Sequence, residues 1–251
     1  MGGAARNEKR RKQDEAARKL AAAGIRVERK TGPNRTAIIL VAVVVVFALL
    51  VGGFIFWQRS SGSSGDVAAT YPVAVSGAVV TAGTGPVVVD TYEDFLCPQC
   101  ERFESRYAGE MKTALNEGKI TVRYHAIAIL DRLTEPQGYS TRAANAALCA
   151  ASANIYPGYH EKLFAEQPAE GGSGLTDEQL IAFGTELGAG ADFAACVTGG
   201  TNSAAVTAET DKAVADPALQ TDGNFGTPTV TVNGQKIDLN DTSWLQTAIG
   251  A

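Results

Sequence analysis

Histidine and cysteine are scarce in this chain of 251 residues, which contains two histidines and four cysteines. A structural zinc site normally needs four ligands, drawn mostly from these residue types. Neither His125 nor His160 has the spacing of a zinc ligand. The sequence therefore argues against a structural zinc site, and we expect neither a metal nor an organic cofactor.

The chain also lacks internal repeats and any motif that resembles a nucleic-acid-binding module. Its net charge of −5 is unevenly divided, because residues 1–36 carry eleven Lys/Arg against four Asp/Glu, a net of +7. The remaining residues carry eleven Lys/Arg against 23 Asp/Glu, a net of −12. The long acidic part argues against a nucleic-acid partner, and the division indicates two environments.

A run of 21 uncharged residues, 37–57, separates the two parts. As a helix it would be about 31 Å long, which is enough to cross a bilayer. The positive flank precedes it, so we expect a single-pass protein of the cell membrane with residues 1–36 in the cytoplasm and the following domain outside. A cleaved signal peptide is the alternative, but its apolar region usually has only about 7–15 residues.

The remainder reads as a linker and one folded domain. Residues 58–70 contain the flexible run SSGSSG. The folded domain is expected over residues 71–251, with a helical insertion at about 138–216. A capping box at Thr176–Gln179 predicts the start of one insertion helix. Asn233-Gly234 between two strand-like runs predicts a hairpin.

Hydrophobic patterning over this domain predicts the order β-α-β, a block of helices, then β-β-α. The expected strands are Val73–Val80, Val87–Tyr92, Ile120–Ile129, Thr229–Val232 and Gln235–Leu239. The expected helices are Pro98–Gly118, Ser140–Asn154, Tyr159–Glu166, Thr176–Leu187, Ala191–Val197, Ser203–Ala215 and Asp241–Ile249.

The motif Cys97-Pro98-Gln99-Cys100 lies where a predicted strand meets a predicted helix. Two cysteines with this spacing can form a disulfide and exchange it with thiols of another protein. Free N–H groups and the helix dipole stabilise a thiolate at a helix amino terminus, and Pro98 suits the first helical position. We expect Cys97 to be the reactive thiol and Cys100 to be more buried. A purely structural disulfide is the alternative.

A second motif, Gly226-Thr227-Pro228-Thr229, precedes the predicted hairpin. Proline lacks a backbone donor, so Pro228 belongs at the start of a strand. On these residues alone, an ordinary trans-proline turn remains open.

Two segments together resemble DsbA-like thiol:disulfide oxidoreductases. They are Val87–Cys100, which includes Cys97-Pro98-Gln99-Cys100, and Phe225–Pro228. The resemblance covers about residues 71–251 and implies an α/β thioredoxin-like fold with an inserted helical subdomain, preceded here by one transmembrane helix. It implies oxidation or reshuffling of disulfides in exported proteins, with Cys97 as nucleophile and Cys100 as resolving cysteine.

The resemblance also implies that Pro228 is cis and faces the disulfide, and that the backbone beside it, at Thr227, holds a substrate strand. It implies a quinone-linked membrane oxidase of the DsbB or vitamin-K-epoxide-reductase-like type as redox partner. Gln99 stands where strong oxidants of the family often have histidine. Asp90 and Glu93 are the candidates for the family's proton-relaying acid. Thr227 precedes the proline, as in some isomerase relatives, in place of a β-branched apolar residue. These three departures concern the strength of the oxidant and not the reaction class.

Cys149 and Cys196 lie in separate predicted helices, and we expect a structural disulfide between them. Closing a loop of about 47 residues would stabilise the domain by about 4 kcal/mol in the chain-entropy model. Two free buried cysteines are the alternative.

Four apolar residues near the motifs are candidates for the rim of the active site. They are Tyr92, Phe95, Leu96 and Phe225. Of these, Phe95 and Phe225 are expected to contact substrate together with Thr227 and Pro228. A core position is the alternative for each of them. His125 alternates with apolar neighbours and is expected to be a core or edge residue.

The leading hypothesis is a dithiol oxidase acting on reduced exported proteins. A reductase or isomerase could use the same residues. A non-catalytic binding module with a passive disulfide, and a metal chaperone that binds copper or zinc through the reduced motif, are rivals of different classes.

Overall fold

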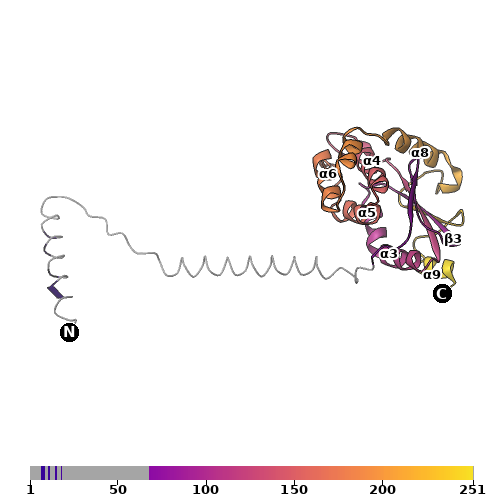
Figure 1. Ribbon diagram of the computed structural model, residues 1–251, viewed down its shortest axis with the longest axis horizontal. Helices are drawn as coiled ribbons and strands as arrows, with labels where there is room; N and C mark the ends of the chain where they lie inside the picture. The colour runs from indigo at the N-terminus through magenta and orange to yellow at the C-terminus, as the bar shows by residue number, and fades with distance from the viewer. Residues whose placement is uncertain (1–6, 9–10, 12–14, 16–17, 19–67, 251) are drawn as a thin grey trace. The chain divides into compact units, whose positions relative to one another are not determined.

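The computed structural model describes residues 7, 8, 11, 15, 18 and 68–250. The chain divides into two units, Met1–Ser64 and Gly65–Ala251, and the second contains the sheet and helices discussed below (Figure 1). The predicted transmembrane segment 37–57 lies outside the described residues. Within the described part, no helix has the length and apolar character that a membrane crossing requires.

The folded unit is built on one six-stranded mixed sheet with the strand order β1-β2-β4-β3-β5-β6. Only β3 and β4 are parallel, and the other neighbouring pairs are antiparallel. The strands are β1 (Val73–Ser76), β2 (Val79–Gly83), β3 (Val87–Glu93), β4 (Ile120–Ala126), β5 (Thr229–Val232) and β6 (Gln235–Lys236).

Helix α3 (Pro98–Asn116) connects the two parallel strands, as the sequence pattern predicts. Its buried side chains recur at helical spacing and include Phe103, Tyr107 and Met111. The helix ends before Gly118, whose φ of +66° is a conformation that glycine adopts without strain.

The two faces of the sheet differ in character. Along β4, Ile120 and Val122 belong to an apolar cluster shared with α3 and α9 (Trp244–Ile249). Because side chains alternate along a strand, Arg123 and His125 point to the opposite face. Helix α8 (Ser203–Ala215) reaches that polar face through a contact with His125. One face therefore holds an apolar core and the other a charged network.

The helices between β4 and β5 form the predicted helical block. They are α4 (Tyr139–Ser152), α5 (Tyr156–Ala165), α6 (Asp177–Glu186), α7 (Ala191–Thr198) and α8, with short 3₁₀ turns at Asp131–Leu133 and Pro217–Leu219. Figure 1 shows α4, α5 and α6 grouped together, with α8 on the other side of α4 from α6. The capping box that opens α6 is confirmed, because the Thr176 and Gln179 side chains each bond the other's backbone N–H.

Helix α4 lies at the centre of this block because its side chains are small. Its alanines from Ala143 to Ala151 are almost all fully buried, which lets neighbouring helices approach closely. It packs against α5, α6, α7 and α8.

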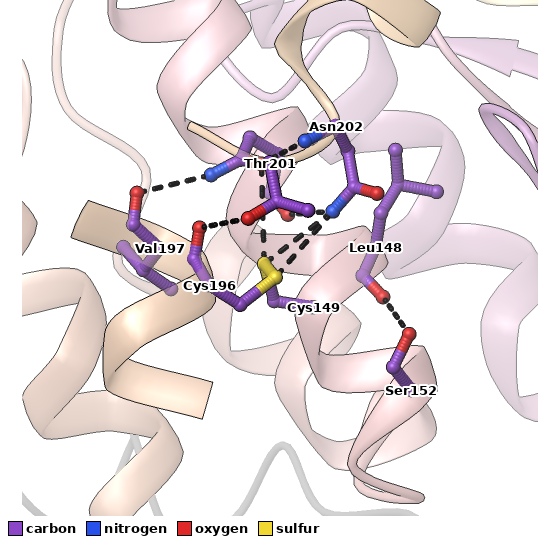
Figure 2. Close-up of a disulfide and its surroundings, with 8 residues drawn as sticks. Leu148, Cys149, Ser152, Cys196, Val197, Thr201 and Asn202 are labelled. Atoms are coloured by element: carbon purple, nitrogen blue, oxygen red, sulfur yellow. Dashed lines mark hydrogen bonds between the residues drawn. A yellow bond between two sulfur atoms is a disulfide. The ribbon is translucent and has the colours of Figure 1, made fainter. Parts of the chain in front are cut away.

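A disulfide between Cys149 of α4 and Cys196 of α7 closes this block, and the expected pairing is confirmed. The two cysteines are 47 residues apart in sequence and their Cα atoms are 5.9 Å apart. Figure 2 shows the Asn202 side chain directed at both sulfur atoms. Its Nδ2 lies 3.4 Å from the Cys149 sulfur and 3.6 Å from the Cys196 sulfur. The start of α8 is thereby tied to the same junction.

One strand prediction was wrong. The run Val73–Val80 was expected to form a single strand, but it forms the hairpin of β1 and β2. Gly77 has a φ of +60°, so the chain reverses there and Ser76 pairs with Val79. A glycine with positive φ suits the tight turn, and the apolar residues on both sides hid it.

Three other elements are shorter than expected. Strand β4 ends at Ala126, because the backbone N–H of Ala128 bonds to the Thr210 hydroxyl of α8 instead of to a strand. Strand β6 ends at Lys236, and α9 begins at Trp244. Between them, Asp238 and Asp241 accept hydrogen bonds from nearby backbone N–H groups, which forms turns in place of regular structure.

Replacing both Cys149 and Cys196 with alanine should lower the free energy of unfolding by about 2–4 kcal/mol, because the unfolded chain loses the loop constraint. Urea unfolding of the variant and the wild-type chain measures this difference. Adding reductant should destabilise the wild-type chain far more than the variant. Equal stability of the two oxidised proteins would contradict the clamping role.

Candidate active site around Cys97 and Cys100

The motif lies at the carboxyl end of β3, where the chain turns into α3. Cys97 is the N-cap residue of α3, and no side chain caps this helix. Its first N–H groups and the positive end of the helix dipole are therefore directed at the Cys97 sulfur. Cys97 is 6% exposed and Cys100 is fully buried, and both are free thiols.

Two polar side chains hold the turn that carries Cys97. The Asp94 carboxylate accepts hydrogen bonds from the backbone N–H groups of Leu96 and Leu130, each 2.9 Å long. The Gln167 side-chain amide donates to the carbonyl oxygens of Phe95 and Cys97, each at 3.1 Å. The motif is thus fixed to the segment after β4 and to the helical block.

The proline loop lies against the reactive sulfur. The peptide bond between Thr227 and Pro228 is cis. The Cys97 thiol donates a hydrogen bond to the Thr227 carbonyl oxygen at 3.2 Å, which joins residues 130 positions apart in sequence. The fold therefore places the two sequence motifs in direct contact.

The two thiols have opposite acidities. A hydrogen bond from Cys100 lowers the pKa of Cys97, burial opposes this, and further donors from Thr227 and the start of α3 leave the pKa at about 6. The pKa of Cys100 is raised well above its usual value, mainly by burial. Near neutral pH, Cys97 is thus mostly a thiolate and Cys100 mostly a thiol.

These features agree with the comparison of the sequence with protein-family models. Residues 77–251 match a family model described as thioredoxin. The chain belongs to the thioredoxin family.

Other comparisons of this thioredoxin domain extend the match. The chain is 31% identical over 180 residues to the serine/threonine-protein kinase PknE of Mycobacterium tuberculosis, a match that covers 69% of this chain. The chain spans about a third of the length of the curated relatives it matches, since 31% of PknE is covered.

Solved structures are similar as well. Oxidised DsbA of Mycobacterium tuberculosis is 30% identical with a TM-score of 0.58, and the match covers 71% of this chain and 90% of DsbA. MdbA of Corynebacterium matruchotii, a thiol-disulfide oxidoreductase, is 25% identical with a TM-score of 0.63, and the match covers 74% and 95%. The expected resemblance to DsbA-like oxidoreductases is confirmed.

The candidate rim residues occupy two different environments. Phe95 and Leu96 are at most 3% exposed, and the Phe95 ring packs against Phe164 at a centroid distance of 5.0 Å. These two residues are therefore core residues beneath the motif, not surface contacts. Tyr92 and Phe225 are partly exposed and meet edge to face at 6.2 Å. Because Phe225 adjoins the proline loop, it remains a surface candidate.

The two candidate acids also differ. Asp90 lies on the polar face of the sheet, where Arg123 Nε is 2.6 Å and His125 Nε2 is 3.0 Å from its Oδ1. Burial alone would raise the pKa of Asp90, but the hydrogen bonds from His125 and Arg123 lower it to about 2. Asp90 is therefore a charged structural residue away from the thiols.

Glu93 lies on the side of the cysteines. It is 4% exposed, and burial raises its pKa to about 8. Its charge also contributes to the raised pKa of Cys100. Of the two candidates, only Glu93 is within electrostatic reach of the redox pair.

Sequence reasoning missed several polar residues of this region. Gln167, Glu104 and Glu209 carry no motif, and each reaches its partner only through the tertiary fold. The prediction that neither histidine has ligand spacing considered neighbours in sequence alone. In the described residues, His160 lies beside Glu93 and Glu104, which come from other elements.

His125 also makes contacts that its sequence context did not indicate. Its two ring nitrogens lie 2.7 Å from Glu209 Oε1 and 3.0 Å from Asp90 Oδ1, and Tyr92 stacks on the ring at 4.1 Å. Although burial lowers the pKa of His125, the hydrogen bonds to Asp90 and Glu209 raise it overall. The hydrogen bonds of His125 to Asp90 and Glu209 thus connect α8 to the sheet.

The Cys97 thiol should titrate with a pKa of about 6, compared with about 8.5 for a free cysteine. Thiolate absorbance in the ultraviolet follows this titration in the reduced chain. Thr227→Val should raise the pKa, because it removes a donor to the thiolate, and Cys97→Ser should abolish the signal. A transition near the value of a free cysteine would contradict the described geometry.

His125→Asn should destabilise the fold most at acidic pH. The pKa of His125 is raised by folding, so its contribution is fully present below the unfolded value of about 6.5 and is lost as pH rises through the folded pKa. Urea unfolding of both chains across this range tests the effect. Lys212→Gln, which alters an exposed partner of Glu209, is the control and should change little. If the difference in stability between the two chains widened with rising pH, the proposed stabilising role of protonated His125 would be refuted.

Proposed function

We propose that this chain is a membrane-anchored thiol:disulfide oxidoreductase of the DsbA type that forms disulfide bonds in exported proteins. The observation that carries the proposal is the contact of the Cys97 sulfur with the Thr227 carbonyl at the cis-proline loop. This contact places the stabilised Cys97 thiolate next to backbone groups with which an incoming peptide can form hydrogen bonds.

The proposed reaction starts from the Cys97–Cys100 disulfide. A substrate thiolate attacks the Cys97 sulfur, which forms a mixed disulfide and releases Cys100 as a thiolate. A second substrate thiolate then attacks the substrate sulfur of the mixed disulfide. The substrate leaves with a new disulfide, and Cys97 leaves as a thiolate, so two electrons have passed to the motif.

The acidities of the two thiols fit this sequence of steps. Cys97, with a pKa of about 6, is a good leaving group in the second step. Cys100, whose pKa burial raises, takes up a proton once it is released. Stabilising the thiolate of Cys97 favours the reduced motif, which makes the disulfide a stronger oxidant. This supports an oxidase over a reductase or isomerase acting through the same residues.

A groove beside the proline loop offers room for the substrate. It is open to solvent and lined by residues from two segments, 224–230 and 236–240. A substrate strand could pair with the backbone at Thr227 while an apolar side chain contacts Phe225. Phe95, which is buried, is proposed to support the motif from beneath and not to contact substrate.

The proposed location follows from the sequence. The 21 uncharged residues 37–57, preceded by a segment of net charge +7, support a single membrane span with the thioredoxin domain outside the cytoplasm. Disulfide formation suits that compartment. A quinone-linked membrane oxidase of the DsbB or vitamin-K-epoxide-reductase-like type is the proposed source of oxidising equivalents.

Refolding of a reduced protein with several cysteines tests the proposal. The oxidised chain should form substrate disulfides without added glutathione, and Cys97→Ser should reduce the rate to background because the attacked sulfur is gone. Cys100→Ser has no motif disulfide to transfer and should also be inactive on reduced substrate. When this variant is given a disulfide-bonded substrate, the Cys97 thiolate should attack that disulfide, release one substrate thiolate and, without a resolving thiol, remain in a mixed disulfide that is visible on non-reducing gels.

Three further results would distinguish the rival functions. Activity only on a substrate with scrambled disulfides would favour an isomerase. A Cys97→Ala chain that retains the cellular phenotype would favour a non-catalytic binding module. Trapping of substrate by Cys97→Ser instead of Cys100→Ser would contradict the assignment of roles.

A further inference from the structure

A cluster of two carboxyl groups and one imidazole lies buried beside the redox pair. Glu93 comes from β3, Glu104 from α3 and His160 from α5. Their exposed fractions are 4%, 7% and 5%. One potential ligand atom from each residue lies within 4.8 Å of the other two. The exchange reaction proposed above uses neither Glu104 nor His160.

The two carboxyl groups of this cluster have few polar neighbours besides each other and Thr91. Both oxygens of Glu93 and Oε1 of Glu104 have no hydrogen-bond partner among the described residues. No Lys or Arg of the described part forms an ion pair with either acid, and Lys112 nearby is paired with Glu161 at 2.6 Å. Burial without such compensation raises the pKa of Glu93 and of Glu104 to about 8, so both acids are mostly protonated near neutral pH. The three side chains therefore offer potential ligand atoms to a cation.

The geometry of His160 suits a ligand. Its Nε2 lies 3.7 Å from Glu93 Oε2 and its Nδ1 lies 3.8 Å from Glu104 Oε2. These separations are too long for hydrogen bonds. The two distances involve different ring nitrogens, and one ion can bind only one of them. With one atom from each residue, the three potential ligand atoms lie within 4.8 Å of one another. Ligands at about 2.0–2.2 Å from one tetrahedral ion lie about 3.3–3.6 Å apart, so binding requires side-chain shifts of about 1 Å. Burial lowers the pKa of His160 and keeps the ring neutral, which is the form that binds metals.

The ring of His160 is held in place by aromatic neighbours. Four rings pack against it, at centroid distances of 4.8 to 5.6 Å: Phe95, Tyr124, Tyr156 and Phe164. Such a shell fixes the orientation of a ligand and excludes bulk water.

We propose that Glu93, Glu104 and His160 bind one divalent transition-metal ion, for which Zn²⁺ is a suitable probe. Binding would release the protons of the two acids, and the resulting two carboxylates with a neutral imidazole would balance the charge of such an ion. A donor set of oxygen and nitrogen suits Zn²⁺ and its neighbours, whereas Mg²⁺ and Ca²⁺ prefer oxygen alone. Three protein ligands leave a fourth position for water.

An ion has a route to the cluster. A surface pocket lined by Tyr71, Lys112 and Glu161 reaches both Glu104 and His160. A second, smaller hollow is lined by Glu93, His160 and apolar residues around them. Because Glu93 acts electrostatically on both Cys97 and Cys100, a bound ion would also influence the redox pair.

Zn²⁺ titration of the full chain, followed by calorimetry, tests the site. The Cys97–Cys100 disulfide must be formed beforehand, so that no thiol competes for the ion. We expect one ion per chain, and we expect Glu104→Gln and His160→Gln each to weaken binding by ~100-fold or more. His125→Gln replaces the other histidine of the chain and is the matched control, with unchanged affinity expected.

X-ray absorption of the Zn²⁺-loaded wild-type chain gives a second test that needs no variant to fold. The expected first shell contains oxygen and nitrogen with one imidazole. Absence of stoichiometric binding, affinity that Glu104→Gln and His160→Gln leave unchanged, or a sulfur-containing shell would each overturn the proposal. None of these readouts requires thiol exchange, so failure here is distinct from failure of the proposed function.

Discussion

The candidate site depends on one electrostatic arrangement, a cysteine sulfur held at the amino terminus of α3. Backbone N–H groups of Gln99 and Cys100 help to lower the pKa of Cys97, and the Thr227 carbonyl oxygen lies 3.2 Å from its sulfur. Parallel pairing of β3 with β4 requires a crossover helix, and this helix starts at the motif. The antiparallel pairing of β3 with β5 brings the proline loop to the same end of the sheet. The topology of the sheet thus brings the two motifs together around the Cys97 sulfur. Neither motif alone would give this sulfur its environment.

The helical block and the polar face of the sheet stabilise this arrangement from two sides. On one side Gln167, which follows α5, bonds the carbonyl of Cys97, while the Cys149–Cys196 disulfide fixes α4 to α7. On the other side His125 joins the sheet to α8 through Asp90 and Glu209. Gln167, the disulfide and Glu209 all belong to the segment between β4 and β5. We infer that this segment helps to hold Cys97 and Cys100 in their reactive positions.

Much of this could be predicted from local sequence signals, because helix and strand periodicity, capping residues and glycine turns act over a few positions. The span of α3, the capping box of α6 and the start of the last hairpin are examples. The turn at Gly77 was missed because apolar residues flank it on both sides. Phe95 was expected near substrate, although the helical block covers it. The cluster of Glu93, Glu104 and His160 escaped prediction because its members come from three elements, and no spacing rule links them.

The central claim is that this arrangement makes the Cys97–Cys100 disulfide an oxidant. The most direct measurement is its reduction potential, obtained by equilibrating the folded chain with glutathione and quantifying the dithiol and disulfide forms. Stabilisation of the Cys97 thiolate predicts a value clearly above about −270 mV, toward the value of about −120 mV that marks strong oxidants. A value at or below about −270 mV would contradict the account, because the motif would then favour the disulfide and act as a reductant.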